Sequence, residues 1–395
     1  MVLRDAGPCY LLRMPRPSNP LPPLAARHTL DEGMLPGHHI RVLAHPHEAW
    51  LCLIEDLRAA QVSILVELYT LMHDRVGGQF LQELSEAVQR GVDVRIELDA
   101  MGSLNLPPAM VERMTQAGIQ WRLYHPVLAG TPFRHWFRRN HRKLVVIDEQ
   151  VAHVSGRNMG EPYYAIEPED VAWLDLGVRV QGPCVETIAA VARSGWKKVA
   201  RPREMPGKWR EKTLAVAAFN AGSLRKAFAI RRILVAVRSA QTSIRMVQAY
   251  FLPDWAMARA LRGAARRHVD VRIIVPDMAT TDQPLVALAS EHGVGQLLRH
   301  GVRVFYVREG TLHGKYTVVD GKWWTVGSAN LDPFSRQHNL EANIAGLGHT
   351  QAQQILANFD ACVRSCRELT WEQWQQRPWW RKFAGAILWR LRGVV

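Results

Sequence analysis

Cysteine is scarce in this sequence and follows no pairing pattern. The chain has 395 residues but only five cysteines, an odd number, and none of them forms a Cys-x-x-Cys pair. A disulfide framework needs an even set, and cysteine-based zinc sites usually contain such close pairs. The sequence therefore indicates neither, and a reducing, cytoplasmic setting is expected for the scattered cysteines: Cys9, Cys52, Cys184, Cys362 and Cys366.

Long apolar runs are also missing. No stretch reaches the roughly 20 apolar residues that a membrane-spanning helix requires, and the first residues lack the apolar core of a secretory signal. We therefore expect no transmembrane helix. Residues 1–36 are instead rich in arginine and proline, which is typical of a disordered tail.

Acidic residues are outnumbered by basic ones, 36 to 50, which gives a formal net charge of +14. Such a charge predicts attraction to a polyanion, either nucleic acid or an acidic lipid surface. Charge alone does not choose between these two classes of partner. The apolar fraction of 48% suits a packed globular protein, and the length leaves room for two domains.

One motif, His-x-Lys-x-x-x-x-Asp, occurs twice. An asparagine, Asn158 or Asn330, follows each copy seventeen residues after its histidine. A single copy would be weak evidence, because these residue types are common on surfaces. Two copies with the same trailing asparagine are strong evidence for a functional site. The motif residues are His141, Lys143 and Asp148 in the first copy and His313, Lys315 and Asp320 in the second.

The spacing within each motif follows strand geometry. Residues 143–147 and 315–319 are mostly β-branched or apolar, which predicts two buried strands. Side chains two residues apart share one face of a strand, so each histidine projects with its lysine. The aspartate falls on the opposite face, near a hairpin turn, and each asparagine lies on or just past the returning strand.

The regions around the two motifs repeat each other. Ala-Gln-Val-Ser-Ile at 60–64 reappears as Ala-Gln-Thr-Ser-Ile at 240–244, and Val-Asp-Val-Arg-Ile occurs at both 92–96 and 269–273. Strands alternate with helices, which predicts a duplicated α/β fold. We expect two mixed, mostly parallel sheets flanked by helices, with a pseudo-two-fold axis that brings both motifs into one shared active site. The expected parts are a tail at 1–36, a first domain at 37–200, a linker at 201–212, a second domain at 213–367 and a C-terminal segment at 368–395.

The C-terminal segment interleaves tryptophan with basic residues. Tryptophan prefers membrane interfaces, and arginine and lysine attract acidic headgroups. Two interpretations stand side by side: a closing helix packed on the second domain, or an amphipathic segment that docks on a membrane. The residues concerned are Trp371, Trp374, Trp379, Trp380, Trp389, Arg377, Arg381, Lys382, Arg390 and Arg392.

The duplicated His–Lys–Asn set predicts phosphoryl transfer. No cluster of metal-ligating residues accompanies either motif, so we expect neither a metal nor a cofactor. One histidine would attack phosphorus, and the other would protonate the leaving oxygen and then deprotonate the incoming alcohol or water. Four groups would stabilise charge on the phosphoryl oxygens: Lys143, Lys315, Asn158 and Asn330.

Each catalytic histidine also needs a carboxylate to fix its tautomer. Trp-Leu-Asp-Leu at 173–176 aligns with Asn-Leu-Glu-Ala at 339–342 in the repeat. This alignment assigns Asp175 to His141 and Glu341 to His313. A basic aromatic loop at 133–139 precedes the first motif and is a candidate for substrate-phosphate contact, whereas three further histidines are interpreted as ordinary polar residues: His135, His153 and His338.

These motifs resemble the phospholipase D superfamily. Over residues 38–365 the chain is similar to bacterial cardiolipin synthases of the type without N-terminal transmembrane helices. The resemblance implies a phosphatidyltransferase that makes cardiolipin from phosphatidylglycerol or a related donor, through a phosphohistidine on His141, with release of the headgroup alcohol. It also implies that Asp148 and Asp320 are structural. Ser155-Gly156 departs from the two glycines usual in the family, which bears on loop geometry. The runs that carry the likeness are 137–143, 156–158, 249–253, 312–315, 325–335 and 339–343.

Other functions are kept as alternatives. The same intermediate would serve a phospholipase D-like hydrolase or a phosphatidylserine-synthase-like transferase. A superfamily nuclease would use the positive charge to bind DNA, but the Trp/Arg-rich C-terminal segment and the run at 339–343 count against it. Two intact motifs disfavour a non-enzymatic membrane-binding module. We expect an anionic phospholipid substrate, no nucleic-acid partner, a functional monomer, and a peripheral position on the cytoplasmic face of the inner membrane.

Overall fold

The computed structural model describes residues 34–126, 136–194, 214–221 and 228–391. The linker expected at 201–212, the arginine- and proline-rich residues 1–33, and residues 133–135 of the basic aromatic loop, including His135, lie outside them. Met34 is 1% exposed and packs in the core of the second half of the chain. Ordered chain therefore begins before residue 36, where the disordered tail was expected to end.

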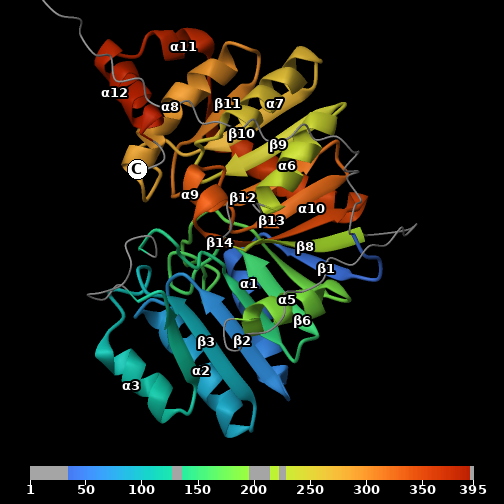
Figure 1. Cartoon of the computed structure of the whole chain (residues 1–395), viewed down its shortest axis with the longest axis vertical. Coiled ribbons are helices and arrows are strands. Elements are labelled where there is room, and N and C mark those ends of the chain that lie inside the picture. Colours follow the sequence, from blue (N-terminus) through green and yellow to red (C-terminus); the bar gives the residue numbers. More distant parts are fainter. Residues whose placement is uncertain (1–33, 127–135, 195–213, 222–227, 392–395) are drawn as a thin grey trace, which may run out of the picture.

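The first half is a seven-stranded sheet in the order β1-β7-β6-β5-β2-β3-β4. It forms the lower part of the molecule in Figure 1. Helices α1, α2 and α3 bury their apolar sides on one face, and α5 packs on the other. The elements are β1 (His39–Leu43), α1 (Pro46–Ala59), β2 (Ser63–Leu68), α2 (Arg75–Gln89), β3 (Asp93–Asp99), α3 (Pro108–Gln116), β4 (Gln120–Tyr124), β5 (Leu144–Ile147), β6 (Val151–Ser155), β7 (Gly177–Gln181) and α5 (Cys184–Ser194).

The second half is an eight-stranded sheet in the order β15-β11-β10-β9-β12-β13-β14-β8. Strand β15 pairs with β11 and ends at Leu369, so this sheet extends two residues beyond the expected domain boundary at 367. The elements are β8 (Leu214–Ala221), α6 (Phe228–Ser239), β9 (Ser243–Gln248), α7 (Trp255–Arg266), β10 (Asp270–Val275), α8 (Pro284–Leu298), β11 (Arg303–Val307), β12 (Lys315–Val319), β13 (Trp323–Gly327), α9 (Pro333–Gln337), β14 (Leu340–Leu347), α10 (His349–Arg364), β15 (Cys366–Leu369), α11 (Trp371–Gln375) and α12 (Trp379–Arg390).

The sheets are mixed, but the expectation that they are mostly parallel is wrong. In the described sheets, parallel pairing is confined to β2-β3-β4 and to β9-β10-β11. Helical crossovers connect these strands, as parallel neighbours require. The motif strands instead return through short turns, as the hairpins β5–β6 and β12–β13, and a short turn permits only antiparallel pairing.

One hydrophobic core joins the two halves. It contains Val154 and Ile188 from the first half and Trp324 and Phe359 from the second, all of them buried. Helices α5 and α10 both contribute to this core. Burial of this apolar surface favours a single relative placement of the two sheets, which fixes the position of one motif relative to the other.

The motif aspartates lie at the hairpin turns, at the opposite end of the motif strands from the histidines. The Asp148 carboxylate accepts hydrogen bonds from the backbone N–H groups of residues 61, 62 and 63, at 2.7–2.9 Å. Asp320 does the same for residues 241, 242 and 243, at 2.8–2.9 Å. Both aspartates have positive φ, +51° and +53°. Each therefore fastens a hairpin to the start of the neighbouring strand, β2 or β9.

Replacing Asp320 by alanine is expected to lower the free energy of unfolding by about 2 kcal/mol, because backbone donors at the start of β9 lose their acceptor. Asp320→Asn keeps one acceptor oxygen and tolerates positive φ, so its loss should be smaller. Urea unfolding of both variants measures the difference. Turnover per folded molecule should stay close to wild type, and a large loss of turnover without loss of stability would contradict the structural role.

The C-terminal helices close one side of the second half by packing on α8 (Figure 1). A Cβ atom at Gly293 would lie 2.5 Å from the Trp389 ring, and one at Gly295 would lie 2.3 Å from the Trp374 ring. Arg377 and Arg381 pair with the buried Glu291 carboxylate, at 2.7 and 3.0 Å. Trp374, Trp389, Arg377 and Arg381 therefore hold the C-terminal helices against α8.

The outer face of α12 remains apolar and exposed. The exposed fraction is 76% for Trp379, 57% for Trp380 and 60% for Phe383, and Ile387 and Leu391 continue the same face. Large apolar side chains gathered on one exposed surface mark an interaction site more often than scattered ones do. One side of α12 therefore packs as a closing helix would, and membrane docking by the exposed side stays a prediction.

Candidate active site

The two motif histidines lie immediately before the central strands β5 and β12. Every residue of both strands is buried, as the apolar sequences predict. His141 and His313 are also largely buried, with 12% and 3% of their side chains exposed. Asn158 and Asn330 follow β6 and β13 by three residues, where they were expected.

The segments that carry the histidines cross between the two halves. Residue 140 forms an isolated parallel bridge with Leu340, and residue 312 forms one with Leu174. The His141 N–H donates to the Leu340 carbonyl at 3.0 Å, and the His313 N–H donates to the Leu174 carbonyl at 2.9 Å. Each motif is therefore held against the chain of the other half, which creates one shared site.

This crossing decides which carboxylate serves which histidine. His141 Nδ1 lies 3.0 Å from both oxygens of Glu341, and His313 Nδ1 lies 2.8 Å from Asp175 Oδ2. The assignment from the sequence, Asp175 to His141 and Glu341 to His313, is wrong. Asp175 follows Leu174 and Glu341 follows Leu340, so each carboxylate arrives beside the histidine that its own backbone segment contacts.

Burial and charge set the protonation of these groups. Burial, reinforced by the Lys315 ammonium, lowers the pKa of His313 to about 4. Burial also lowers the pKa of His141, although the Glu341 carboxylate opposes this. Burial alone would raise the pKa of Glu341, but His141, Lys143 and the Ser328 hydroxyl together lower it below its usual value. Both imidazoles are therefore neutral at pH 7, and their Nδ1–H groups can donate to ionised carboxylates.

The motif lysines are buried beside the histidines. Lys143 Nζ donates to the His141 carbonyl at 2.8 Å, and Lys315 Nζ donates to the His313 carbonyl. Burial lowers the pKa of both ammonium groups. An anion placed between the two histidines would oppose that effect and would hold both lysines in the charged form.

The two asparagines are fixed by hydrogen bonds to the ends of neighbouring strands. Asn158 Oδ1 accepts from the backbone N–H of Thr70 at 3.3 Å, and its Nδ2 donates to the Tyr163 hydroxyl at 3.0 Å. Asn330 Oδ1 accepts from the backbone N–H of Tyr250 at 3.4 Å. These contacts fix their positions beside the motifs, and phosphate contact by their amide groups remains a prediction.

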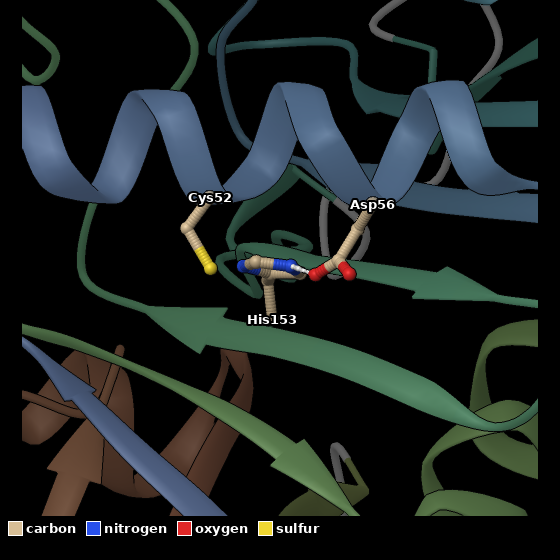
Figure 2. A group of neighbouring side chains, drawn as sticks. All are labelled: Cys52, Asp56 and His153. Carbon is tan, nitrogen blue, oxygen red and sulfur yellow. Dashed lines mark hydrogen bonds and ion pairs between the residues drawn. The ribbon is translucent and has the colours of Figure 1, made fainter.

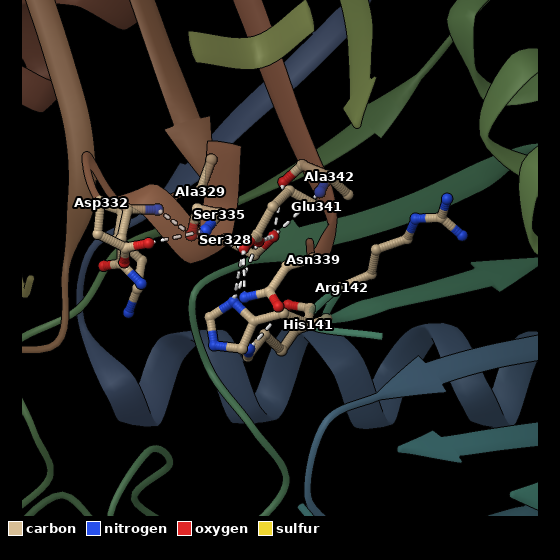
Figure 3. A network of polar contacts seen from close by, with 12 residues as sticks. His141, Arg142, Ser328, Ala329, Asp332, Ser335, Asn339, Glu341 and Ala342 are labelled. Carbon is tan, nitrogen blue, oxygen red and sulfur yellow. Dashed lines mark hydrogen bonds and ion pairs between the residues drawn. The ribbon is translucent and has the colours of Figure 1, made fainter. Parts of the chain in front are cut away.

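Two serines that the sequence analysis missed hold the Glu341 carboxylate (Figure 3). Ser335 Oγ donates to Glu341 Oε1 at 2.7 Å, and Ser328 Oγ donates to Oε2 at 2.5 Å. They fix the rotamer of the group that orients His141. The repeat could have drawn attention to Ser328, because this serine aligns with Gly156 of the first half and is a difference between the two copies. A Cβ atom at Gly156 would lie 2.5 Å from Asp175 Oδ2, which excludes a serine there.

Aromatic rings enclose the histidines. Tyr69 lies edge-on to His141 at 5.3 Å between ring centroids, and Tyr163 lies edge-on to His313 at 5.1 Å. Trp173 also contacts His313, at 5.6 Å. Nothing in the local sequence identified these rings, because they come from loops outside both motifs.

A separate cluster of possible metal ligands lies between α1 and β6 (Figure 2). It consists of Cys52, Asp56 and His153, and His153 Nε2 is 2.6 Å from Asp56 Oδ2. Arg179 donates to both oxygens of Asp56, at 2.7 and 2.8 Å, and Arg41 lies 3.8 Å from the Cys52 sulfur. Two of the three possible ligands, Asp56 and Cys52, therefore already have guanidinium partners. His153 is therefore part of a structural ion-pair network.

None of the helices in the described part of the chain has the length and hydropathy needed to cross a bilayer. Comparison with known families matches residues 53–176 and 233–363 to the family described as cardiolipin synthase, PLD-like domain. The two matched ranges contain the two motifs and their asparagines.

Among curated proteins, the chain is 32% identical to cardiolipin synthase B of Salmonella typhi, over 88% of this chain and 86% of the relative. It is 30% identical to a cardiolipin synthase of Geobacillus kaustophilus, over 88% of this chain and 70% of the relative. Among solved structures, phosphatidylserine synthase of Haemophilus influenzae Rd KW20 superposes with a TM-score of 0.72 at 16% identity, over 90% of this chain and 95% of that one. That superposition establishes the fold.

Proposed function

This chain belongs to the cardiolipin synthases that are built from phospholipase D-like domains, and from that membership we propose that it transfers a phosphatidyl group between two lipid molecules. The donor is phosphatidylglycerol or a related phospholipid, and the product is cardiolipin. The observation that supports this most strongly is the pair of buried histidines, each oriented by a carboxylate of the other half.

The reaction proceeds in two steps. Nε2 of one histidine attacks the donor phosphorus, a P–N bond forms, and the P–O bond to the headgroup glycerol breaks. The other histidine gives its proton to the departing oxygen. It then takes the proton of a hydroxyl on the acceptor lipid, whose oxygen attacks phosphorus and releases the first histidine. Free glycerol and cardiolipin are the balanced products.

The chain supplies the charge and the proton for these steps. Both imidazoles are neutral in the free protein, so one is ready to attack. The donor phosphate is an anion, and its charge raises the pKa of the second imidazole and favours the protonated acid. Lys143 and Lys315 approach the same phosphate from the two halves and stabilise charge that develops on its oxygens.

Incubating the protein with vesicles of labelled phosphatidylglycerol tests the function. We expect labelled cardiolipin and one free glycerol for each cardiolipin formed. Phosphatidic acid as the main lipid product would identify a hydrolase instead. A lipid product that forms only when serine is added would identify a phosphatidylserine-synthase-like transferase.

We propose further that the protein works from a membrane surface and that the exposed face of α12 contributes to docking. Replacing Trp379, Trp380 and Phe383 together by glutamine should weaken binding to phosphatidylglycerol vesicles by at least about tenfold, because burial of one such side chain contributes about 1.5–3 kcal/mol. Vesicle co-sedimentation at low and high salt measures the loss. High salt should screen the attraction between the basic residues and the acidic vesicles. It should not reduce the part of the binding that comes from the aromatic rings.

A matched control for that triple substitution is Leu51→Gln, since Leu51 is also exposed and apolar but lies on α1. It should bind vesicles like the wild type. Truncation before α11 would be a poor test, because it would uncover the side of α8 that carries Glu291. Unchanged binding by the triple variant would leave α12 as a closing helix alone.

A further inference from the structure

A cavity of about 250 Å³ lies beside the catalytic centre in the second half. Residues of α6, the start of α7, the short helix α9 and the end of α12 surround it. Its polar wall holds two carboxylates and two guanidinium groups, and its apolar wall includes Ile230 and Met257. The volume is just below the range of about 300–1,000 Å³ typical of sites for small molecules, which suits a lipid headgroup. The charged residues are Asp254, Asp332, Arg336 and Arg390.

This cavity connects directly to the catalytic machinery through α9. Asp332 lines it and caps α9 by accepting the Ser335 N–H at 2.7 Å. The hydroxyl of the same Ser335 donates to Glu341, which orients His141 (Figure 3). Asp332 also acts electrostatically on Lys315. The cavity and the phosphorus-binding centre therefore share α9 as a wall.

The two guanidinium groups have donors available for a ligand. The only described acceptor for Arg336 is Asp254 Oδ2, at 3.4 Å, and Arg336 Nε is buried without a hydrogen-bond partner. Within residues 228–391 and the other described ranges, Arg390 forms no hydrogen bond or ion pair. The Arg336 side chain is 36% exposed and its contact with Asp254 is long, so both arginines can offer guanidinium N–H donors to a ligand with acceptor oxygens.

We propose that this cavity binds the headgroup of the second phospholipid, the one that supplies the acceptor hydroxyl, with its phosphate between Arg336 and Arg390. This inference rests on the function proposed above. Guanidinium groups match phosphate oxygens in charge and geometry. Asp254 and Asp332 accept hydrogen bonds from the headgroup hydroxyls, and Asp332 lies on the side that faces the catalytic centre.

Two further observations agree with this assignment. Burial raises the pKa of Asp332 to about 7, so near neutral pH this carboxyl repels a phosphate less than an ordinary aspartate would. The apolar face of α12 continues past the cavity through Ile387 and Leu391, both exposed. Acyl chains of a lipid whose headgroup occupies the cavity can lie along that face.

Arg390→Gln tests the acceptor site, because Arg390 is exposed and has no described partner that folding depends on. The assay uses vesicles with labelled phosphatidylglycerol and measures the ratio of cardiolipin formed to phosphatidic acid released by water. We expect this ratio to fall about tenfold, as loss of one charge-assisted hydrogen bond predicts, and to recover as the mole fraction of acceptor lipid is raised. A general weakening of the fold or of vesicle binding would lower both products together.

Lys382→Gln is the matched control, since it removes the same charge from α12 at a position that does not line the cavity. Its ratio should equal that of the wild type. An unchanged ratio in Arg390→Gln, or an equal fall in Lys382→Gln, would overturn the acceptor site. Inorganic phosphate that binds in an Arg390-dependent way, while cardiolipin formation does not depend on Arg390, would also overturn it in favour of a free-phosphate site. Absence of any lipid product from the wild type would instead refute the proposed function.

Discussion

Alanine in place of either motif histidine is expected to abolish detectable turnover while the protein stays folded. Loss of a positioned acid or base alone costs about 10²–10⁴-fold, and loss of the nucleophile removes the covalent route entirely. His141 and His313 stand at opposite sides of one shared site, and each has its own lysine and its own carboxylate. Neither histidine can therefore take over the role of the other.

The two variants should fail in different ways. The family resemblance implies that His141 is the nucleophile. In the His313→Ala variant, His141 can then still attack a donor that has a good leaving group. Transfer of the phosphatidyl group from His141 to the acceptor should be slow, because the base is missing. Rapid quenching should then trap a phosphatidyl group on the protein. His141→Ala should trap nothing, and the opposite result would exchange the two roles.

Circular dichroism and a thermal melt serve as controls for both histidine variants. Each substitution removes a buried ring, so some loss of stability is expected. A folded variant that retained near-wild-type cardiolipin formation would rule out the two-histidine mechanism.

Replacing the orienting carboxylates should have the second largest effect. Glu341→Gln and Asp175→Asn are each expected to lower turnover by about 10²–10⁴-fold, because an amide cannot stabilise the imidazolium that forms during proton transfer. Glutamine retains most of the shape of Glu341 and one acceptor oxygen for Ser328 and Ser335. A loss of activity would therefore report on charge more than on packing.

Histidine titration by NMR separates the crossed pairing from pairing within each half. The Glu341 carboxylate raises the pKa of His141, so Glu341→Gln should lower the pKa of His141 further and leave that of His313 nearly unchanged. Asp175→Asn should lower the pKa of His313 further below about 4. A clear change in the pKa of His313 in the Glu341→Gln variant would contradict the crossed pairing.

Some features followed from the sequence because they depend on neighbours along the chain. The β-branched and apolar residues at 143–147 and 315–319 predicted the buried strands β5 and β12. A turn directly after each motif aspartate forces a hairpin and places Asn158 and Asn330 just past the returning strand. The repeat of all these features predicted a duplicated fold with one site.

Other features were decided only by tertiary structure, because they depend on contacts between distant segments. The local sequence around Asp175 and Glu341 does not show whether each carboxylate pairs with the histidine of its own half or of the other half. The bridges at Leu174 and Leu340 place each one beside the histidine of the other half. The sequence also could not tell which tryptophans face α8. Trp389 packs against Gly293 and Trp374 against Gly295, where a Cβ atom would collide with each ring.

The cavity beside α9 shows the same limit most clearly. Its walls come from α6, α7, α9 and α12, which are separate segments of the chain, and no local pattern links Arg336 to Arg390. Periodicity encodes which face of an element is apolar, so it predicts elements and their buried sides. Which elements meet, and which polar groups they bring together, is set by the packing of the whole core, and this determines the partners of both histidines and the second binding site.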